Sequence, residues 1–106
     1  MNVTIYVEPS QAANSVLPLV RSTVEAEITR LELALEMAQK RLAPFEQRYQ
    51  VASEKLMASL TAEDLDGGDD EYVTWAGEYS LKERLQTKLQ QLQAVRYGHP
   101  ELLQQN

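Results

Sequence analysis

The sequence predicts an all-α protein, a single domain over residues 1–106, in which a long bent helix and a second helix fold antiparallel into a hairpin after a short N-terminal strand. The stretch from Val24 to Leu60 has no glycine and carries apolar residues at alternating steps of three and four. A second apolar stripe follows the paired Gly67 and Gly68. An apolar repeat of seven residues is typical of helices that pack closely on other helices. The hairpin should therefore be coiled-coil-like.

Residues 1–9 are expected to form a strand, because Val3, Ile5 and Val7 alternate with more polar residues until Pro9. A single strand cannot satisfy its own backbone hydrogen-bonding groups. We expect it to pair with a partner chain or with its own copy in a second molecule, and the remaining alternative is that it frays.

Residues 16–60 are expected to form the long helix, with Ser22 and Glu25 as a capping box near its start. Pro44 removes one backbone donor and crowds the preceding turn. Because the apolar repeat continues in register beyond it, Pro44 predicts a bend rather than a stop. A break near Gln50 is the alternative.

An acidic connector over residues 61–70 separates this helix from the second, which is expected over residues 70–97. Gly98 and Pro100 then end the second helix and leave residues 98–106 as a tail. The connector and the following position hold six of the sixteen acidic residues of the chain. They are the predicted partner-binding residues: Glu63, Asp64, Asp66, Asp69, Asp70 and Glu71.

The apolar stripes predict which residues pack between the helices or in a dimer. Trp75 is the largest of them and should be buried. Two helices of unequal length leave part of the first stripe uncovered, which predicts a homodimer in a four-helix bundle. The predicted packing residues are Val24, Ile28, Leu31, Leu35, Leu42, Phe45, Tyr49, Leu56, Tyr72, Trp75, Tyr79, Leu85, Leu89 and Leu92.

Composition narrows the possible environment and partners. There is no cysteine, and no apolar run approaches the length that crosses a bilayer, so no membrane segment and a cytoplasmic location are expected. The formal net charge of −6 gathers in the connector, while the rest of the chain is nearly neutral. This distribution argues against broad nucleic-acid contact and favours a basic protein as partner.

No residue pattern predicts a metal site, a cofactor or catalysis. A calcium loop that started at Asp64 would need glycine at its sixth position and glutamate at its twelfth, where this chain has Asp69 and Trp75. Carboxylate metal sites of helical bundles use a Glu-x-x-His pair, and the only histidine, His99, has no glutamate three residues before it. We therefore expect a protein that is not an enzyme.

A strand followed by helices is also typical of ribbon-helix-helix DNA-binding proteins. The outward strand residues would then be Asn2, Thr4, Tyr6 and Glu8, and no arginine or lysine occurs among the first 20 residues to contact phosphate. A DNA-binding or scaffolding homodimer is the alternative function.

About half of the chain, from Leu42 to Val95, resembles a family of small helical proteins of bacteria and archaea that are predicted to be antitoxins because they are encoded beside a predicted toxin. Relatives tend to have glycine after the tyrosine at position 49, where this chain has Gln50. The resemblance implies a non-enzymatic, antitoxin-like partner that binds and restrains a basic, toxin-like protein. It is carried by Phe45-Glu46, Tyr49, Ser53-Glu54, Leu56, Leu60, Asp69-Asp70, Tyr72-Val73, Trp75, Glu78-Tyr79, Arg84-Leu85, Leu89 and Leu92.

Overall fold

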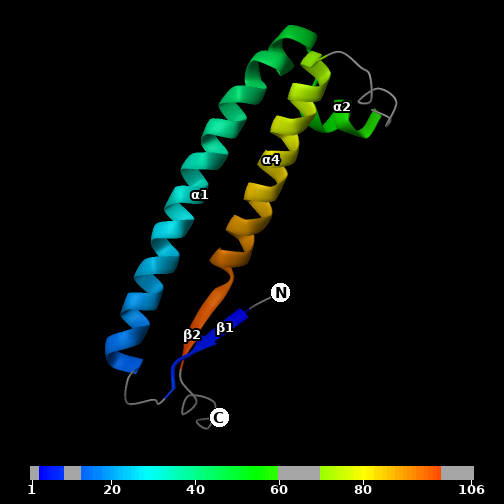
Figure 1. Cartoon of the computed structure of the whole chain (residues 1–106). Helices are drawn as coiled ribbons and strands as arrows, with labels where there is room; N and C mark the ends of the chain where they lie inside the picture. The colour runs from blue at the N-terminus through cyan, green and yellow to red at the C-terminus, as the bar shows by residue number, and fades with distance from the viewer. Residues whose placement is uncertain (1–2, 9–12, 60–69, 99–106) are drawn as a thin grey trace. The chain divides into compact units, whose positions relative to one another are not determined.

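The computed structural model describes residues 3–8, 13–59 and 70–98 and is mostly helical (Figure 1). Its elements in chain order are β1 (Val3–Tyr6), α1 (Ala13–Tyr49), α2 (Ser53–Ser59), α4 (Asp70–Gln93) and β2 (Val95–Gly98). Backbone contacts divide the chain into two compact units, Met1–Glu32 with Thr87–Asn106, and Leu33–Gln86. The predicted helical architecture is confirmed, and a second strand is added to it.

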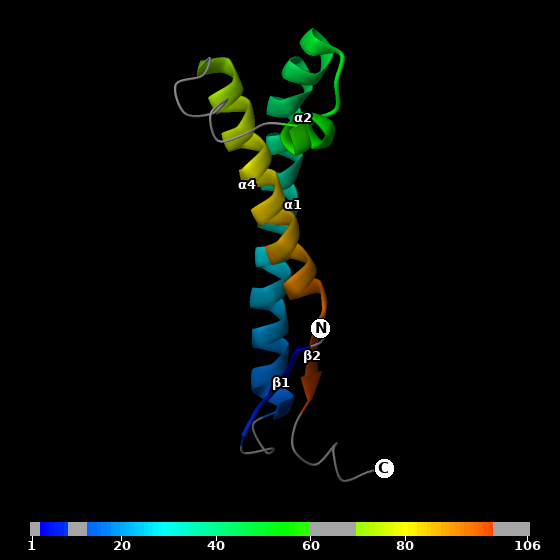
Figure 2. The same cartoon turned by 90° about the vertical axis from the view of Figure 1, so that its right-hand side faces the viewer.

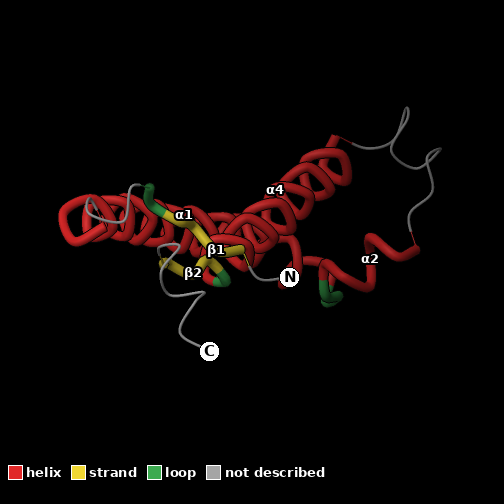
Figure 3. The backbone as a smooth tube through the Cα atoms, turned by 90° about the horizontal axis from the view of Figure 1, so that it is seen from below, coloured by secondary structure: helices red, strands yellow, loops and turns green. Residues whose placement is uncertain are grey.

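In the first unit, β1 pairs in parallel with β2 of the same chain, in a register that sets Val3 beside Val95 and Tyr6 beside Gly98. The amide of Val7 continues the pairing and donates to the Gly98 carbonyl at 3.3 Å. The expectation that β1 needs another molecule, or frays, is therefore wrong. The two strands, yellow in Figure 3, lie beside the first turns of α1, as Figure 2 also shows.

The formation of β2 shortens the second helix relative to its predicted end. The helix ends at Gln93 rather than in the expected range 70–97, and Gly98 closes a strand instead of opening a tail. The backbone groups of β1 need partners, and Val95 and Tyr97 are residue types that favour strands, so pairing takes precedence over a last helical turn. The rest of the predicted tail, residues 99–106, lies outside the described residues.

In the second unit, α1 and α4 pack antiparallel. Two ion pairs show the direction: Arg41 Nε lies 2.7 Å from Glu78 Oε2, and Arg48 Nη1 lies 2.6 Å from Glu71 Oε1. Residue numbers therefore rise along α1 in the direction in which they fall along α4. The seven-residue repeat places its apolar residues on the facing sides of the two helices. The buried side chains of this unit are Ala38, Leu42, Ser53, Trp75 and Leu85.

The long helix does not continue to residue 60 as predicted: α1 ends at Tyr49, although it passes through Pro44 without a break. Gln50 takes a left-handed conformation with φ 54°, and the amide of Val51 donates to the carbonyl of Glu46 at 3.3 Å. A left-handed residue followed by such a backward hydrogen bond is the Schellman ending of a helix. The alternative of a break near Gln50 is thus the correct one.

The packing residues predicted on the first part of α1 are more covered than the dimer argument assumed. Leu31 is 1% exposed, and Val24, Ile28 and Leu35 are partly exposed. The start of α1 shares a compact unit with the strand pair and the end of α4, and Leu31 is buried within this single chain. The four-helix bundle was predicted because these positions were expected to be uncovered. That premise is wrong for Leu31. None of the described helices is long and apolar enough to cross a bilayer.

Candidate functional site

The predicted acidic partner-binding residues divide between the described and undescribed parts of the chain. Glu63, Asp64, Asp66 and Asp69 lie outside the described residues. Asp70 is exposed and begins α4, where its charge is favourable near the positive end of the helix. Glu71 faces α1: its carboxylate accepts hydrogen bonds from the Arg48 guanidinium and from the Tyr49 hydroxyl. Glu71 therefore stabilises the helix pair within the chain.

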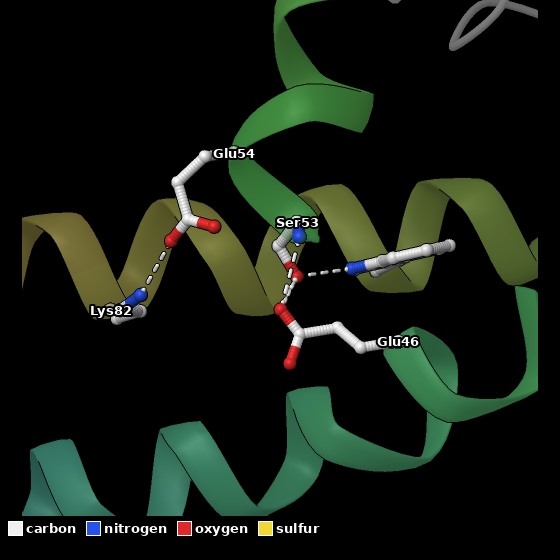
Figure 4. Close-up of polar contacts among 5 residues, drawn as sticks. Glu46, Ser53, Glu54 and Lys82 are labelled. Carbon is white, nitrogen blue, oxygen red and sulfur yellow. Dashed lines mark hydrogen bonds and ion pairs between the residues drawn. The ribbon is translucent and has the colours of Figure 1, made fainter. Parts of the chain in front are cut away.

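A chain of three hydrogen-bonded side chains connects α1, α2 and α4 within the second unit (Figure 4). The indole Nε1 of Trp75 donates to Ser53 Oγ at 2.8 Å, and the Ser53 hydroxyl donates to Glu46 Oε2 at 2.7 Å. The same carboxylate oxygen accepts the Ser53 amide at 3.0 Å. Because indole nitrogen can only donate, the direction of both side-chain bonds is fixed. We call Glu46, Ser53 and Trp75 the joint.

Aromatic rings enclose the joint on the α1 and α4 sides. Phe45 and Tyr49 stack on Trp75 with centroids 5.4 Å and 5.6 Å away, and Tyr72 lies 6.5 Å from it. Trp75 and Ser53 are both fully buried. The rings exclude water from the indole N–H and the serine hydroxyl, so each polar group depends on its partner in the joint. The predicted burial of Trp75 is confirmed.

An ion pair fastens α2 to α4 beside the joint. Lys82 Nζ lies 2.9 Å from Glu54 Oε1, and Figure 4 shows this pair next to Ser53. The lysine side chain is 15% exposed and the glutamate 56%, so the cation is the more sheltered member. The hydrogen bond from Lys82 lowers the pKa of Glu54 below its ordinary value. Lys82 also lies 5.6 Å from the ring of Tyr79, whose pKa a hydrogen bond to Glu83 raises to about 12.

The arrangement of the joint suits mechanical support better than bond-making chemistry. A serine beside a carboxylate can be the start of a nucleophile and base pair. Here the Ser53 hydroxyl is fully buried, accepts a hydrogen bond from Trp75 and donates one to Glu46. Both its acceptor and its donor are therefore used within the chain. An open hollow of about 400 Å³ runs past Glu46, Gln47 and Gln50, and Ser53 does not line it. Among the described residues, no three His, Cys, Asp or Glu side chains are grouped to hold a metal ion.

Several exposed apolar residues were not predicted from the sequence, and two of them share one side of α1 in the second unit. Leu33 is 59% exposed and Met37 46% exposed, and they lie one turn apart on α1 in the second unit. Their spacing of four residues could have indicated that they share one side of the helix. Both lie between positions of the buried apolar repeat, which dominates this stretch of sequence. By contrast, the resemblance to antitoxin-like proteins already included every member of the joint.

No family model, curated protein or solved structure matches this chain. Its resemblance to antitoxin-like proteins therefore depends on the residues quoted for it.

Proposed function

We propose that this chain is a non-enzymatic protein-protein interaction module, an antitoxin-like partner that binds and restrains a basic protein. The observation that carries the proposal is the exposed apolar pair on α1, Leu33 and Met37. Large apolar side chains one turn apart on a helix are the usual anchors of a helix that enters a partner's groove. The resemblance to antitoxin-like proteins supports the same function.

One exposed acidic residue next to this pair can contact a cationic partner. Glu36 lies three positions after Leu33 on α1, and it is exposed. Glu36 has Lys40 at 3.4 Å, an exposed pair that water screens and that a stronger cation can replace. A basic groove would meet the apolar anchors and Glu36 together.

The acidic connector supports the proposal because it should speed the association of a basic partner, whereas it should contribute little to how long the complex lasts. Helix capping uses one or two acids, whereas six lie between Glu63 and Glu71. Like charges so close in sequence repel one another, and a cationic partner relieves that repulsion. Attraction of this kind mainly accelerates encounter, while apolar anchors slow dissociation.

The test is co-expression with the product of the neighbouring gene. Leu33→Ser with Met37→Ser should raise the dissociation constant at least tenfold, mostly through faster dissociation. Val16→Ser, an exposed apolar residue of the other unit, is the control and should leave binding unchanged. Absence of any complex with the intact chain contradicts the proposal, and a shift of upstream DNA in a gel would then favour the alternative DNA-binding function.

A second set of variants tests the connector. Asp64, Asp66 and Asp69 changed to Asn should slow association at low salt, with little change at high salt. The control changes Glu8, Glu25 and Glu101 to Gln, which alters net charge equally but leaves the connector intact. Equal association rates for the two triple variants contradict the role of the connector.

A further inference from the structure

One face of α4 in the second unit is mostly exposed, and the buried Leu85 lies at its edge. Its residues recur at steps of three, four and seven, so they share one side, about half a turn around the helix from Trp75. Val73 is 45% exposed, Leu81 is partly exposed, and the others are exposed. We call this surface the Gly77 face; it consists of Asp70, Val73, Thr74, Gly77, Ser80, Leu81 and Arg84.

Gly77 is the residue of this face that the single chain does not explain. It lies inside a helix of 24 residues, where glycine is a poorer helix former than any residue except proline. A Cβ added at Gly77 would meet nothing within 4 Å, so packing inside the chain does not require its absence. Glycine in such a place is useful where another backbone approaches closely.

Residues at equal distances before and after Gly77 are similar in size, and the outermost two carry opposite charges. Thr74 and Ser80 lie three positions before and after it, and Val73 and Leu81 four positions before and after it. Asp70 and Arg84 lie seven positions away, nearly two turns, or about 10 Å along the axis in each direction. An antiparallel copy that crosses at Gly77 therefore sets only small and medium-sized residues near the centre and brings opposite charges together at both ends.

The two end charges are available for such a contact. Within the described residues, neither Asp70 nor Arg84 makes an ion pair, whereas Glu71 and Glu78 on the other side of α4 pair with arginines of α1. A chain of net charge −6 repels its own copy in general. Two Asp70 to Arg84 contacts related by symmetry would oppose this repulsion locally and would select the antiparallel orientation.

We propose that a second copy of this chain packs antiparallel on the Gly77 face, with a two-fold axis at Gly77. The interface is isologous, so each copy contributes the same residues and every contact occurs twice. The surface differs from the α1 stripe from which the sequence predicted a dimer. The proposal does not rest on the proposed function, because it concerns α4 and a second copy rather than α1 and a basic partner.

A charge-reversal cycle tests the pairing by sedimentation equilibrium at low salt. Asp70→Arg and Arg84→Asp should each raise the dimer dissociation constant at least tenfold, because each single change sets two like charges together twice. The double variant restores opposite charges and should return to within about threefold of the original value. Glu25→Arg and Lys55→Asp match the two charge changes on other surfaces and should leave the dimer intact.

The absence of cysteine allows a direct test of the two-fold axis. Gly77→Cys places a single thiol where the copies cross, and a short bismaleimide should link two such chains. If the new side chain prevents close approach, Thr74→Cys mixed with Ser80→Cys should still link, while Lys55→Cys on α2 should not. A mass of 12.0 kDa for the unmodified chain at 100 micromolar, or a dimer unaffected by either charge reversal, would overturn the proposal.

Discussion

Replacing Ser53 with alanine should lower the free energy of unfolding by about 2 kcal/mol. The hydroxyl is the acceptor for the buried indole N–H of Trp75, and a buried donor left without a partner costs about 1–3 kcal/mol. Glu46 loses the hydroxyl donor but keeps the Ser53 amide at 3.0 Å, so its carboxylate retains one partner. For a chain of this length, a loss of 2 kcal/mol corresponds to a melting temperature lower by about 8 °C.

The matched control is Ser59→Ala in the same helix. The Ser59 hydroxyl donates to the Leu56 carbonyl at 2.8 Å, but it is exposed and water can replace it. Its removal should change the free energy of unfolding by no more than about 0.5 kcal/mol. Both variants delete one hydroxyl from α2, so the difference between them reports the buried position of Ser53 in the joint.

A double-mutant cycle separates the hydrogen bond from other effects of the Ser53 change. Trp75→Phe removes the indole donor, so adding Ser53→Ala to it should cost less than about 1 kcal/mol. Urea unfolding followed by the helical circular dichroism signal suits all variants, including those without tryptophan. The reasoning is refuted if Ser53→Ala costs no more than Ser59→Ala, or costs equally in both Trp75 backgrounds.

The helix ending, the α2 ion pair and the strand pair each give a further prediction. Gln50→Gly should raise the free energy of unfolding by about 0.5 kcal/mol because φ is 54° there, whereas Gln47→Gly inside α1 should lower it by about 1 kcal/mol; urea unfolding distinguishes the signs. Because Lys82 lowers the pKa of Glu54 from 4.5, their pairing stabilises the fold above that pH and is lost as pH falls through the lowered value. The melting-temperature difference between the intact chain and Glu54→Gln should therefore be constant near neutral pH and shrink below 4.5. Ile5→Pro should remove hydrogen-exchange protection from β2 and leave the circular dichroism of the helices unchanged, since proline has no amide to donate; retained protection would contradict the strand pairing.

Periodicity allowed much of the helical packing to be predicted. Leu31, Leu42, Trp75 and Leu85 were identified from apolar spacing alone, and all four are buried. Burial at regular intervals is a local property of a helix, so a window of one or two heptads is enough to reveal it. The directions in which such helices pack follow from the short connection between them.

The predicted start of the long helix was also wrong, because α1 begins at Ala13 and the predicted capping residue Ser22 lies inside it. The other two errors in the element boundaries depend on contacts between residues distant in sequence. The apolar repeat continues from Tyr49 through Leu56, so spacing alone favours one helix there. The structure instead turns at Gln50, which sets Ser53 between Glu46 and Trp75. Likewise, Val95 fits the leucine repeat of α4, yet it leaves that helix to pair with Val3 at the other end of the chain. Local spacing contains no information about either partner.

Several of the residues that carry the resemblance to antitoxin-like proteins lie in or beside the joint, and this placement bears on where a partner would bind. Glu46, Ser53 and Trp75 use their polar groups on one another, and Tyr49 donates to Glu71 in the same unit. The joint residues hold the turn between the helices and cannot themselves contact a partner without breaking buried hydrogen bonds. Recognition should then depend on exposed positions such as Leu33 and Met37, which lie outside the resemblance and are free to differ between proteins that share the joint. Exchange of those surface residues between two such proteins should transfer partner choice, whereas exchange of joint residues should alter stability alone.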